Sequence, residues 1–272
     1  MPDDQFRLHR TDGDLDIACV LDVLHGKLAA YQVSGFLAES DCRTVTDNFW
    51  ASMARTPRYG AGADGVEAYI VGASHIDKTT AHYLDDVERT EAAVRGLYKN
   101  ADDPVARLRT LLADAGAVPG ARPAAHGGRV AGSSKAVCWN NIDEYLLLPH
   151  DDLAQLSDPL QAGFEIQRIR RVMAVNVYPH VPGHGGAVKI WNVIPDAETR
   201  ARLEVTHSGY PYPPHLLADH ASIEIRVAAG DLCVINGNLV HGVLGGDDTD
   251  RGRLLITCFT GLAETGELLF WT

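Results

Sequence analysis

From residue 136 to its end, the chain is a succession of short β-rich runs separated by glycine-rich turns. The runs are AVCWNN, EYLLL, RVMAVNVY, AVKIWNVI, SIEIRVAA, DLCVI, LVHGV, RLLITCFT and ELLFW. Turn sequences such as PGHGG, AAGD, NGN and GGDD lie between them. Many short strands joined by such turns predict a β-sandwich or a jelly roll. This half of the chain is therefore expected to be mainly β.

The first half alternates helical and extended patterns. Strands are predicted over 29–36 and 67–72, and helices from Ser40 or Asp41 to about Met53, over 77–99, and from Asp102 or Asp103, before Pro104, to near Gly116. Residues 117–134, VPGARPAAHGGRVAGSSK, are rich in Gly, Pro and Ala and predict a loop, the best candidate for a mobile lid or a boundary. We interpret residues 1–272 as a single domain, in which 1–135 form a mixed helix and strand part with the lid and 136–272 form the core.

Composition excludes several classes of function. A formal net charge of −12 argues against a nucleic-acid partner, because phosphate binding needs a basic surface. No apolar window is long enough for a transmembrane helix, and the polar, acidic start does not resemble a signal peptide. The cysteines, odd in number and without a CxxC, indicate reduced thiols in a cytoplasmic protein. A homodimer is left open.

The stretch LLLPHDDLAQL (146–156) raises the first functional question. Side chains alternate along an extended segment, so His150 and Asp152 point to one side and Asp151 to the other. An imidazole and a carboxylate at this spacing are two ligands of a facial triad, and a second histidine from a distant strand would complete it. His241, in GDLCVINGNLVHGV, is the candidate. The alternatives are a solvated strand end and a histidine satisfied within the core.

Polar residues on later strands suggest an anion site. Arg253 opens the apolar strand RLLITCF, and a buried arginine needs an anionic partner, which a guanidinium can hold bidentately. Arg251 could be the anchor instead, and Arg253 could simply extend to water. In RVMAVNVY, Asn176 and Tyr178 share one face and would need a polar partner inside the fold. A bound dicarboxylate would supply it.

At this point the sequence resembles the Fe(II)/2-oxoglutarate-dependent dioxygenases, over about 146–260, and most closely the small bacterial enzymes that hydroxylate or halogenate amino acids and natural-product intermediates. The further residues that carry the resemblance are Arg171, Tyr178, Gly185-Gly186 and Gly230-Asp231. The resemblance implies a double-stranded β-helix (a jelly-roll, cupin-like core) with N-terminal helices packed on it. It implies Fe(II) held by His150, Asp152 and His241, with 2-oxoglutarate and O₂ as cosubstrates. It also places the 2-oxoglutarate carboxylate on Arg253, beside Asn176 and Tyr178.

The resemblance also bears on the outcome of the reaction. His184-Gly185-Gly186 reads as H-x-G, the halogenase form of the ligand motif, but the glycine pair corresponds to a loop of the family. With Asp152 present, iron would have no free halide position. The resemblance therefore implies hydroxylation, desaturation or ring closure of a small-molecule substrate rather than halogenation.

Substrate contacts and rival functions complete the sequence-based expectations. Asn141, Trp191, Ser74 and Lys78 are the candidate substrate-binding residues, and segments 68–80 and 117–141 are expected to roof the site. Sheet packing, turn capping or simple exposure would explain the same four residues. A cupin-type metalloenzyme without 2-oxoglutarate is the nearest rival, although the first cupin motif is not found and Arg253 would have no role. A binding domain without enzymatic activity is the second rival.

Overall fold

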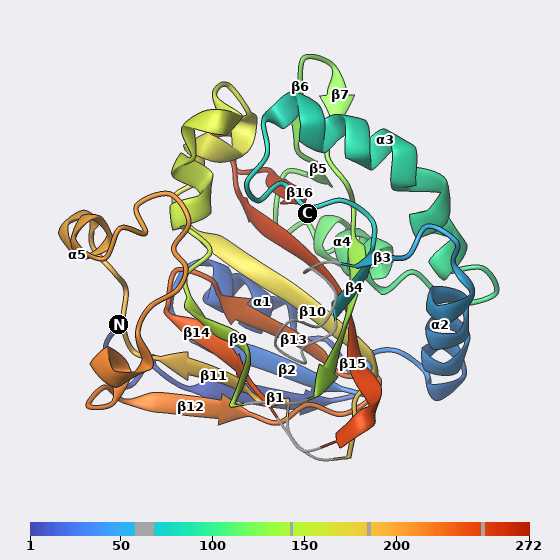
Figure 1. Ribbon diagram of the computed structural model, residues 1–272, viewed down its shortest axis with the longest axis horizontal. Helices are drawn as coiled ribbons and strands as arrows, with labels where there is room; N and C mark the ends of the chain where they lie inside the picture. The colour runs from blue at the N-terminus through green and yellow to red at the C-terminus, as the bar shows by residue number, and fades with distance from the viewer. Residues whose placement is uncertain (58–67, 142–143, 184–185, 246–247) are drawn as a thin grey trace.

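The computed structural model describes residues 1–57, 68–141, 144–183, 186–245 and 248–272, with the backbone alone at 140–141 and 248–251. Within this part the strands form two main sheets (Figure 1). The larger has the order β1 (Leu8–Asp12), β2 (Ala30–Ser34), β13 (Leu232–Asn236), β10 (Val172–His180), β15 (Asp248–Leu262), β8 (Lys135–Asn141), β4 (Ala68–Val71), β3 (Thr56–Pro57), and β16 (Leu268–Trp271) joins β15 to β5 (Ala121–Pro123). The smaller has the order β12 (Ser222–Ile225), β11 (Val188–Trp191), β14 (His241–Leu244), β9 (Tyr145–His150). The prediction of a mainly β chain is confirmed.

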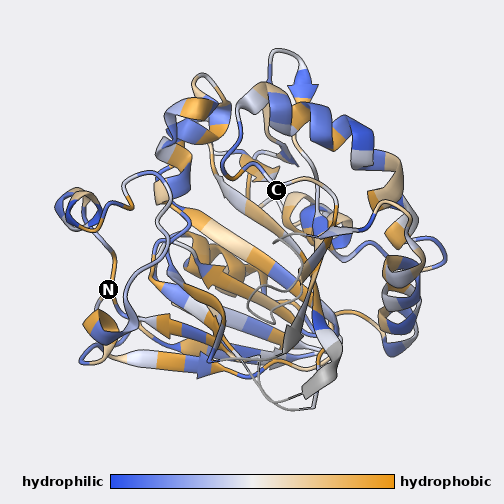
Figure 2. Ribbon diagram, viewed as in Figure 1, coloured by the Kyte–Doolittle hydropathy of each residue, from blue (hydrophilic) through white to orange (hydrophobic). Residues whose placement is uncertain are grey.

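Helices cover the outer face of the larger sheet. They are α1 (Ile17–Leu24), α2 (Glu39–Ala51), α3 (Thr80–Leu97) and α4 (Pro104–Asp114), while α5 (Ala197–Arg202) lies apart, with no buried residue (Figure 1). Short 3₁₀ helices connect the strands: η1 (Ala154–Ser157), η2 (Pro159–Gln161), η3 (Glu165–Arg168) and η4 (Pro214–Leu217). Apolar residues of α1, α2 and α4 form one buried cluster with the larger sheet. Figure 2 shows hydrophilic residues all around α5 and mainly hydrophobic ones on the central strands.

The period of two along the strands divides the larger sheet into a helix-facing side and an interior side. On β10, Met173, Val175 and Val177 pack against the helices, whereas Ala174 and Tyr178 belong to a second cluster that also contains residues of the smaller sheet. The strand β15 alternates in the same way. Since side chains on a strand point alternately to opposite faces, both strands present every second residue to the space between the two sheets.

Helix starts follow capping chemistry where the sequence offers a cap. The Asp103 carboxylate accepts hydrogen bonds from the backbone N–H groups of Val105 and Ala106, and Pro104 takes the first helical position of α4, as predicted. The cap predicted at Ser40 or Asp41 is wrong. The N-cap of α2 is Ala38, two or three residues earlier than predicted, and Ala38 provides no side-chain cap. Acidic Glu39 and Asp41 in the first turn still favour the positive end of the helix dipole.

The loop predicted over 117–134 contains short strands. The strand β5 pairs in parallel with β16, and β6 (Ala125–His126) pairs with β7 (Arg129–Val130). Five strands from residues 1–135 join the larger sheet, so both halves of the chain contribute strands to it. None of the described helices combines the length and the apolar character of a membrane span.

Candidate metal centre

Three buried side chains from two adjacent strands converge at one point. His150 ends β9, Asp152 follows two residues later, and His241 opens β14 directly opposite His150 in the antiparallel register. One ligand atom from each of the three lies within 4.8 Å of the others. His241 Nε2 is 3.4 Å from Asp152 Oδ2, and His150 Nε2 is 3.8 Å from Asp152 Oδ1. The structure thus brings together the three residues predicted as metal ligands.

Backbone carbonyls fix the orientation of both imidazoles. His150 Nδ1 lies 2.9 Å from the carbonyl oxygen of Leu148, and His241 Nδ1 lies 2.9 Å from that of Leu239. A carbonyl can only accept, so Nδ1 carries the proton in each ring and Nε2 is the nitrogen with a lone pair. Both Nε2 atoms are directed to the Asp152 side. A second hydrogen bond of this kind is what orients metal-binding histidines in proteins.

The Asp152 carboxylate is buried directly against Gly237, where any side chain would collide with it. Its Oδ2 has no hydrogen-bond partner among the described residues. A Cβ at Gly237 would stand 2.6 Å from this oxygen, and the Asp152 backbone N–H donates to the Gly237 carbonyl at 2.8 Å. Burial raises the pKa of Asp152 to about 6, while the nearby His241 acts in the opposite direction. Two imidazole nitrogens and one orphaned carboxylate oxygen fit a divalent transition metal such as iron.

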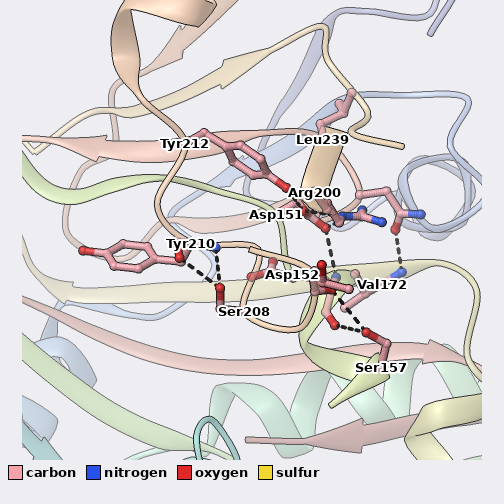
Figure 3. Close-up of polar contacts among 12 residues, drawn as sticks. Asp151, Asp152, Ser157, Val172, Arg200, Ser208, Tyr210, Tyr212 and Leu239 are labelled. Atoms are coloured by element: carbon pink, nitrogen blue, oxygen red, sulfur yellow. Dashed lines mark hydrogen bonds and ion pairs between the residues drawn. The ribbon is translucent and has the colours of Figure 1, made fainter. Parts of the chain in front are cut away.

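The adjacent Asp151 points away from this centre, as alternation predicts, but it is fully buried. Arg200 donates to its carboxylate from Nε (3.1 Å) and Nη2 (2.8 Å), and the Tyr212 hydroxyl donates at 2.7 Å (Figure 3). The backbone N–H of Ala154 adds a bond of 3.0 Å. Asp151 therefore ties the end of β9 to residues 203–213, which we call the strap. Sequence reasoning missed Arg200 and Tyr212, because nothing local marks a pairing across 49 and 61 residues.

The strap brings two polar side chains to the metal centre. Ser208 and Tyr210 both line the cavity described below, and the Ser208 hydroxyl donates to the Tyr210 carbonyl at 2.9 Å (Figure 3). The Tyr210 ring lies edge-on to His150, with ring centroids 6.2 Å apart. The short, glycine-containing sequence THSGYPY gives no sign of this role, and the position depends on the Asp151 contacts.

A cavity of about 730 Å³ opens beside the three ligands, between the two sheets. Its walls are mostly apolar and come from β8, β10 and β15 on one side and from β9, β11 and β14 on the other. The predicted residues Asn176, Tyr178, Arg253, Ser74 and Lys78 all line it. Segment 70–78 forms part of the wall, as expected, but none of residues 117–134 does. Of the segment 117–141 expected to roof the site, Lys135 and Trp139 line the cavity, whereas residues 117–134 contain β5 and the β6–β7 hairpin.

Arg253 lies on the interior side of β15 with no exposed surface. Its guanidinium stacks on the Tyr178 ring, 4.8 Å from the ring centroid, and its three nitrogens have no hydrogen-bond partner within the described part of the chain. Nearby, the Thr257 hydroxyl donates to Asn176 Oδ1 at 2.8 Å. A buried guanidinium without hydrogen-bond partners costs free energy, and a bound anion would remove that cost. The side chain of Arg251, the alternative anchor, lies outside the described residues.

The candidate substrate contacts divide into three groups. Ser74 accepts a hydrogen bond from Lys135 Nζ (3.0 Å), and Lys78 pairs with Asp86 at 2.6 Å, both at the cavity wall. Trp191 is buried in a separate cluster with Val205, Tyr212, Leu217 and Val240 and does not line the cavity. The side chain of Asn141, like His184 and Gly185, lies outside the described residues. Lys135 and Gln155 line the cavity but were missed by sequence reasoning.

The sequence of the chain is similar to those of two known enzymes. No family model matches the chain. It is 28% identical to the L-isoleucine 3(1)-dioxygenase of Pantoea ananatis over 97% of this chain and 92% of that one. It is 25% identical to the L-γ-glutamyl-L-propargylglycine hydroxylase of Streptantibioticus cattleyicolor, over 92% and 91%.

Solved structures share the fold. An N-substituted L-amino acid dioxygenase from Burkholderia ambifaria superposes with a TM-score of 0.56 at 14% identity, covering 94% of this chain and 91% of that one. The non-heme α-ketoglutarate-dependent epimerase SnoN of nogalamycin biosynthesis gives a TM-score of 0.51 at 14% identity, over 92% and 88%. The chain is therefore similar in sequence to a dioxygenase and a hydroxylase over more than nine-tenths of its length, and it shares its fold with a further dioxygenase and an α-ketoglutarate-dependent epimerase.

Proposed function

We propose that this protein is an Fe(II)/2-oxoglutarate-dependent oxygenase that hydroxylates an unactivated C–H bond of an amino acid or of an intermediate derived from one. One observation carries the proposal. The His150, Asp152 and His241 ligand atoms meet at the wall of a cavity of about 730 Å³ that also contains the buried guanidinium of Arg253. A metal site and an anion site in one cavity are what iron and a dicarboxylate cosubstrate require.

The roles of the protein groups follow from their positions. His150 and His241, each held by a backbone carbonyl, and Asp152, in the space left by Gly237, would hold Fe(II). Fe(II) with 2-oxoglutarate supplies the activation of O₂ and the oxidising power for C–H cleavage. Arg253, stacked on Tyr178, would hold the distal carboxylate of 2-oxoglutarate, with Asn176 lining the same end of the cavity. The mostly apolar walls keep water from the reacting groups.

Three features support an amino-acid substrate and a hydroxylated product. The cavity volume is in the range of small-molecule sites. The two curated relatives are named for isoleucine and for a γ-glutamyl amino acid. The carboxylate of Asp152 occupies the position that a halide would need, so hydroxylation, or the related desaturation or ring closure, is favoured over halogenation.

We further propose that the two sheets form a jelly roll and that residues 1–272 fold as one domain. The facing interior sides of the sheets, with the cavity between them, support the first point. The strands β1 to β5, contributed by residues 1–135 to the larger sheet, support the second. On this proposal residues 136–272 supply the metal and anion sites, whereas the first half supplies sheet edges and part of the cavity wall.

Turnover of 2-oxoglutarate tests the proposed function. The protein with Fe(II), 2-oxoglutarate, ascorbate and O₂ is incubated with each of the standard L-amino acids, and succinate and amino-acid products are measured by mass spectrometry. We expect succinate release stimulated by at least one amino acid, with a product one oxygen atom heavier, and its loss in Asp152→Ala but not in the exposed control Asp12→Ala. Metal bound without 2-oxoglutarate turnover would instead support the cupin-type alternative.

A further inference from the structure

The cavity wall carries a second buried cation besides Arg253. Lys135, at the start of β8, is 2% exposed and lines the cavity. In the antiparallel register of β8 and β15, Lys135 stands opposite Thr257, and Trp139 stands opposite Arg253. Four residues of strand therefore separate the two cations, a distance of about 13 Å along the sheet. The two cations therefore line the same cavity from well-separated backbone positions on its wall.

The Lys135 ammonium is held in a defined place. Its Nζ donates to the Ser74 hydroxyl at 3.0 Å and lies over the Phe259 ring, 5.4 Å from the centroid. Gly72, with a φ of +115°, allows the chain after β4 to approach the lysine, since a Cβ there would be 2.9 Å from Lys135 Cβ. A positive charge fixed by packing on both sides is suited to bind an anion at low entropic cost.

The other basic side chains at the cavity already share a carboxylate. Lys78 Nζ lies 2.6 Å from Asp86, and Arg89 also contacts Asp86. Asp86 is 5% exposed, and these neighbours lower the pKa of its carboxyl group. Lys78, a predicted substrate contact, is thus engaged within the protein.

A buried acceptor on the cavity wall complements the cation. Gln155 lies in η1, three residues after the ligand Asp152, and is 7% exposed. Its Oε1 is buried and has no hydrogen-bond partner in the described ranges. A buried amide oxygen without a donor costs free energy, so it indicates that a ligand N–H binds there.

We propose that Lys135, positioned by Ser74, binds the α-carboxylate of the substrate, and that Gln155 accepts a hydrogen bond from its α-ammonium group. This inference rests on the proposed function, because it names the part of the cavity that binds the α-carboxylate and α-ammonium groups of an amino acid. The cosubstrate carboxylate at Arg253 and the substrate carboxylate at Lys135 would then occupy separate positions in the cavity, so that the two anions do not compete. The ligand class is an α-amino acid with a free carboxylate.

Calorimetric binding without turnover tests the assignment. The protein is loaded with Mn(II) and 2-oxoglutarate and titrated with the standard L-amino acids, and the best binder is compared with its carboxamide. We expect wild type to bind the acid about 10- to 100-fold more tightly than the carboxamide, as expected for a hydrogen bond to a charged group. Lys135→Met should abolish this preference, Lys135→Arg should retain part of it, and the exposed control Lys99→Met should leave it unchanged.

The same titrations distinguish a failure of the carboxylate assignment from a failure of the proposed function. If wild type prefers the acid but Lys135→Met weakens acid and carboxamide equally, the carboxylate assignment is overturned while the proposed function stands. If wild type binds 2-oxoglutarate but no amino acid, the substrate class itself fails and Lys135 with it.

Two further measurements do not depend on the Lys135 variant folding. Ser74→Ala should lower the acid preference several-fold without changing 2-oxoglutarate affinity. Gln155→Leu should weaken both the acid and the carboxamide, which share the amino group, while an unchanged affinity would overturn the role of Gln155.

Discussion

Two neighbouring aspartates directly after β9 show how the direction of a side chain decides the role of a residue. Asp151 and Asp152 are both buried, yet Asp151 is fully hydrogen-bonded by Arg200, Tyr212 and backbone N–H, whereas Asp152 Oδ2 is left without a partner. Alternation sends one carboxylate into the protein and the other into the cavity. Only the second is available as a ligand.

The directions of His150 and Asp152 were predictable from the sequence, because a period of two requires no tertiary information. Lys135 was not predictable in this way. A lysine at the start of a strand ordinarily reaches water, and its burial here depends on the approach of Gly72 from another strand. The burial of Arg253 was not predictable from the sequence either, because it depends on packing against the Tyr178 ring of another strand.

A buried histidine outside the metal centre makes stability depend on pH. Burial lowers the pKa of His75 to about 3, and its Nδ1 lies 3.0 Å from the Thr272 carbonyl, to which it donates. The unfolded chain, with a histidine pKa of about 6.5, binds the proton first, so this residue contributes stability above pH 6.5 that is lost as pH falls toward 3. At pH 5 the loss from this group should be about 2 kcal/mol.

Urea denaturation at pH 7 and pH 5 measures this effect. His75→Gln retains an N–H donor and does not titrate, so it should lose about 2 kcal/mol less than wild type between the two pH values. The exposed control His215→Gln should behave as wild type. An equal loss in His75→Gln and wild type would show that His75 is not the group responsible.

At the scale of elements, local signals fixed some boundaries and failed at others. The Asp103-Pro104 pair marks the start of α4 correctly, because both the cap and the proline act within one turn. The start of α2 was missed, since Ala38 provides no cap and packing sets the boundary. Residues 117–134 have the composition of a loop, but β16 provides a pairing partner that composition cannot reveal.

The strap depends on contacts of Asp151. Tyr212→Phe removes a hydrogen bond of 2.7 Å to a buried carboxylate, which should destabilise the protein by about 1.5–3 kcal/mol. Because the strap carries Ser208 and Tyr210 to the cavity, amide hydrogen exchange over 205–213 should also quicken in this variant.

Tyr145→Phe, at the start of β9 and packed against the cluster that contains Tyr212, is the matched control for volume and position. Exchange that stays at the wild-type rate in Tyr212→Phe, despite a lower stability, would mean that the strap is held by other contacts. The KM for the substrate should rise more than kcat falls, since the strap shapes the cavity rather than the metal ligands.

At the scale of the whole molecule, the function depends on two sheets meeting. The smaller sheet supplies His150 and His241, and the larger sheet supplies Arg253 and Lys135. The sequence predicted a β-rich core and the metal ligands because both are indicated by short local patterns of residues. It could not predict the cavity, because strands as distant as β4, β8 and β15 become neighbours only in the folded sheet.

The most direct test of the account is the absorption spectrum of the anaerobic complex. Fe(II) and then 2-oxoglutarate are added to the metal-free protein, and the weak visible band of the iron–2-oxoglutarate chelate is recorded. We expect the band in wild type and in the exposed control Arg43→Met, no band in Asp152→Ala, and at least about a tenfold higher 2-oxoglutarate requirement in Arg253→Met. Iron bound by wild type with no band on addition of 2-oxoglutarate would contradict the central claim.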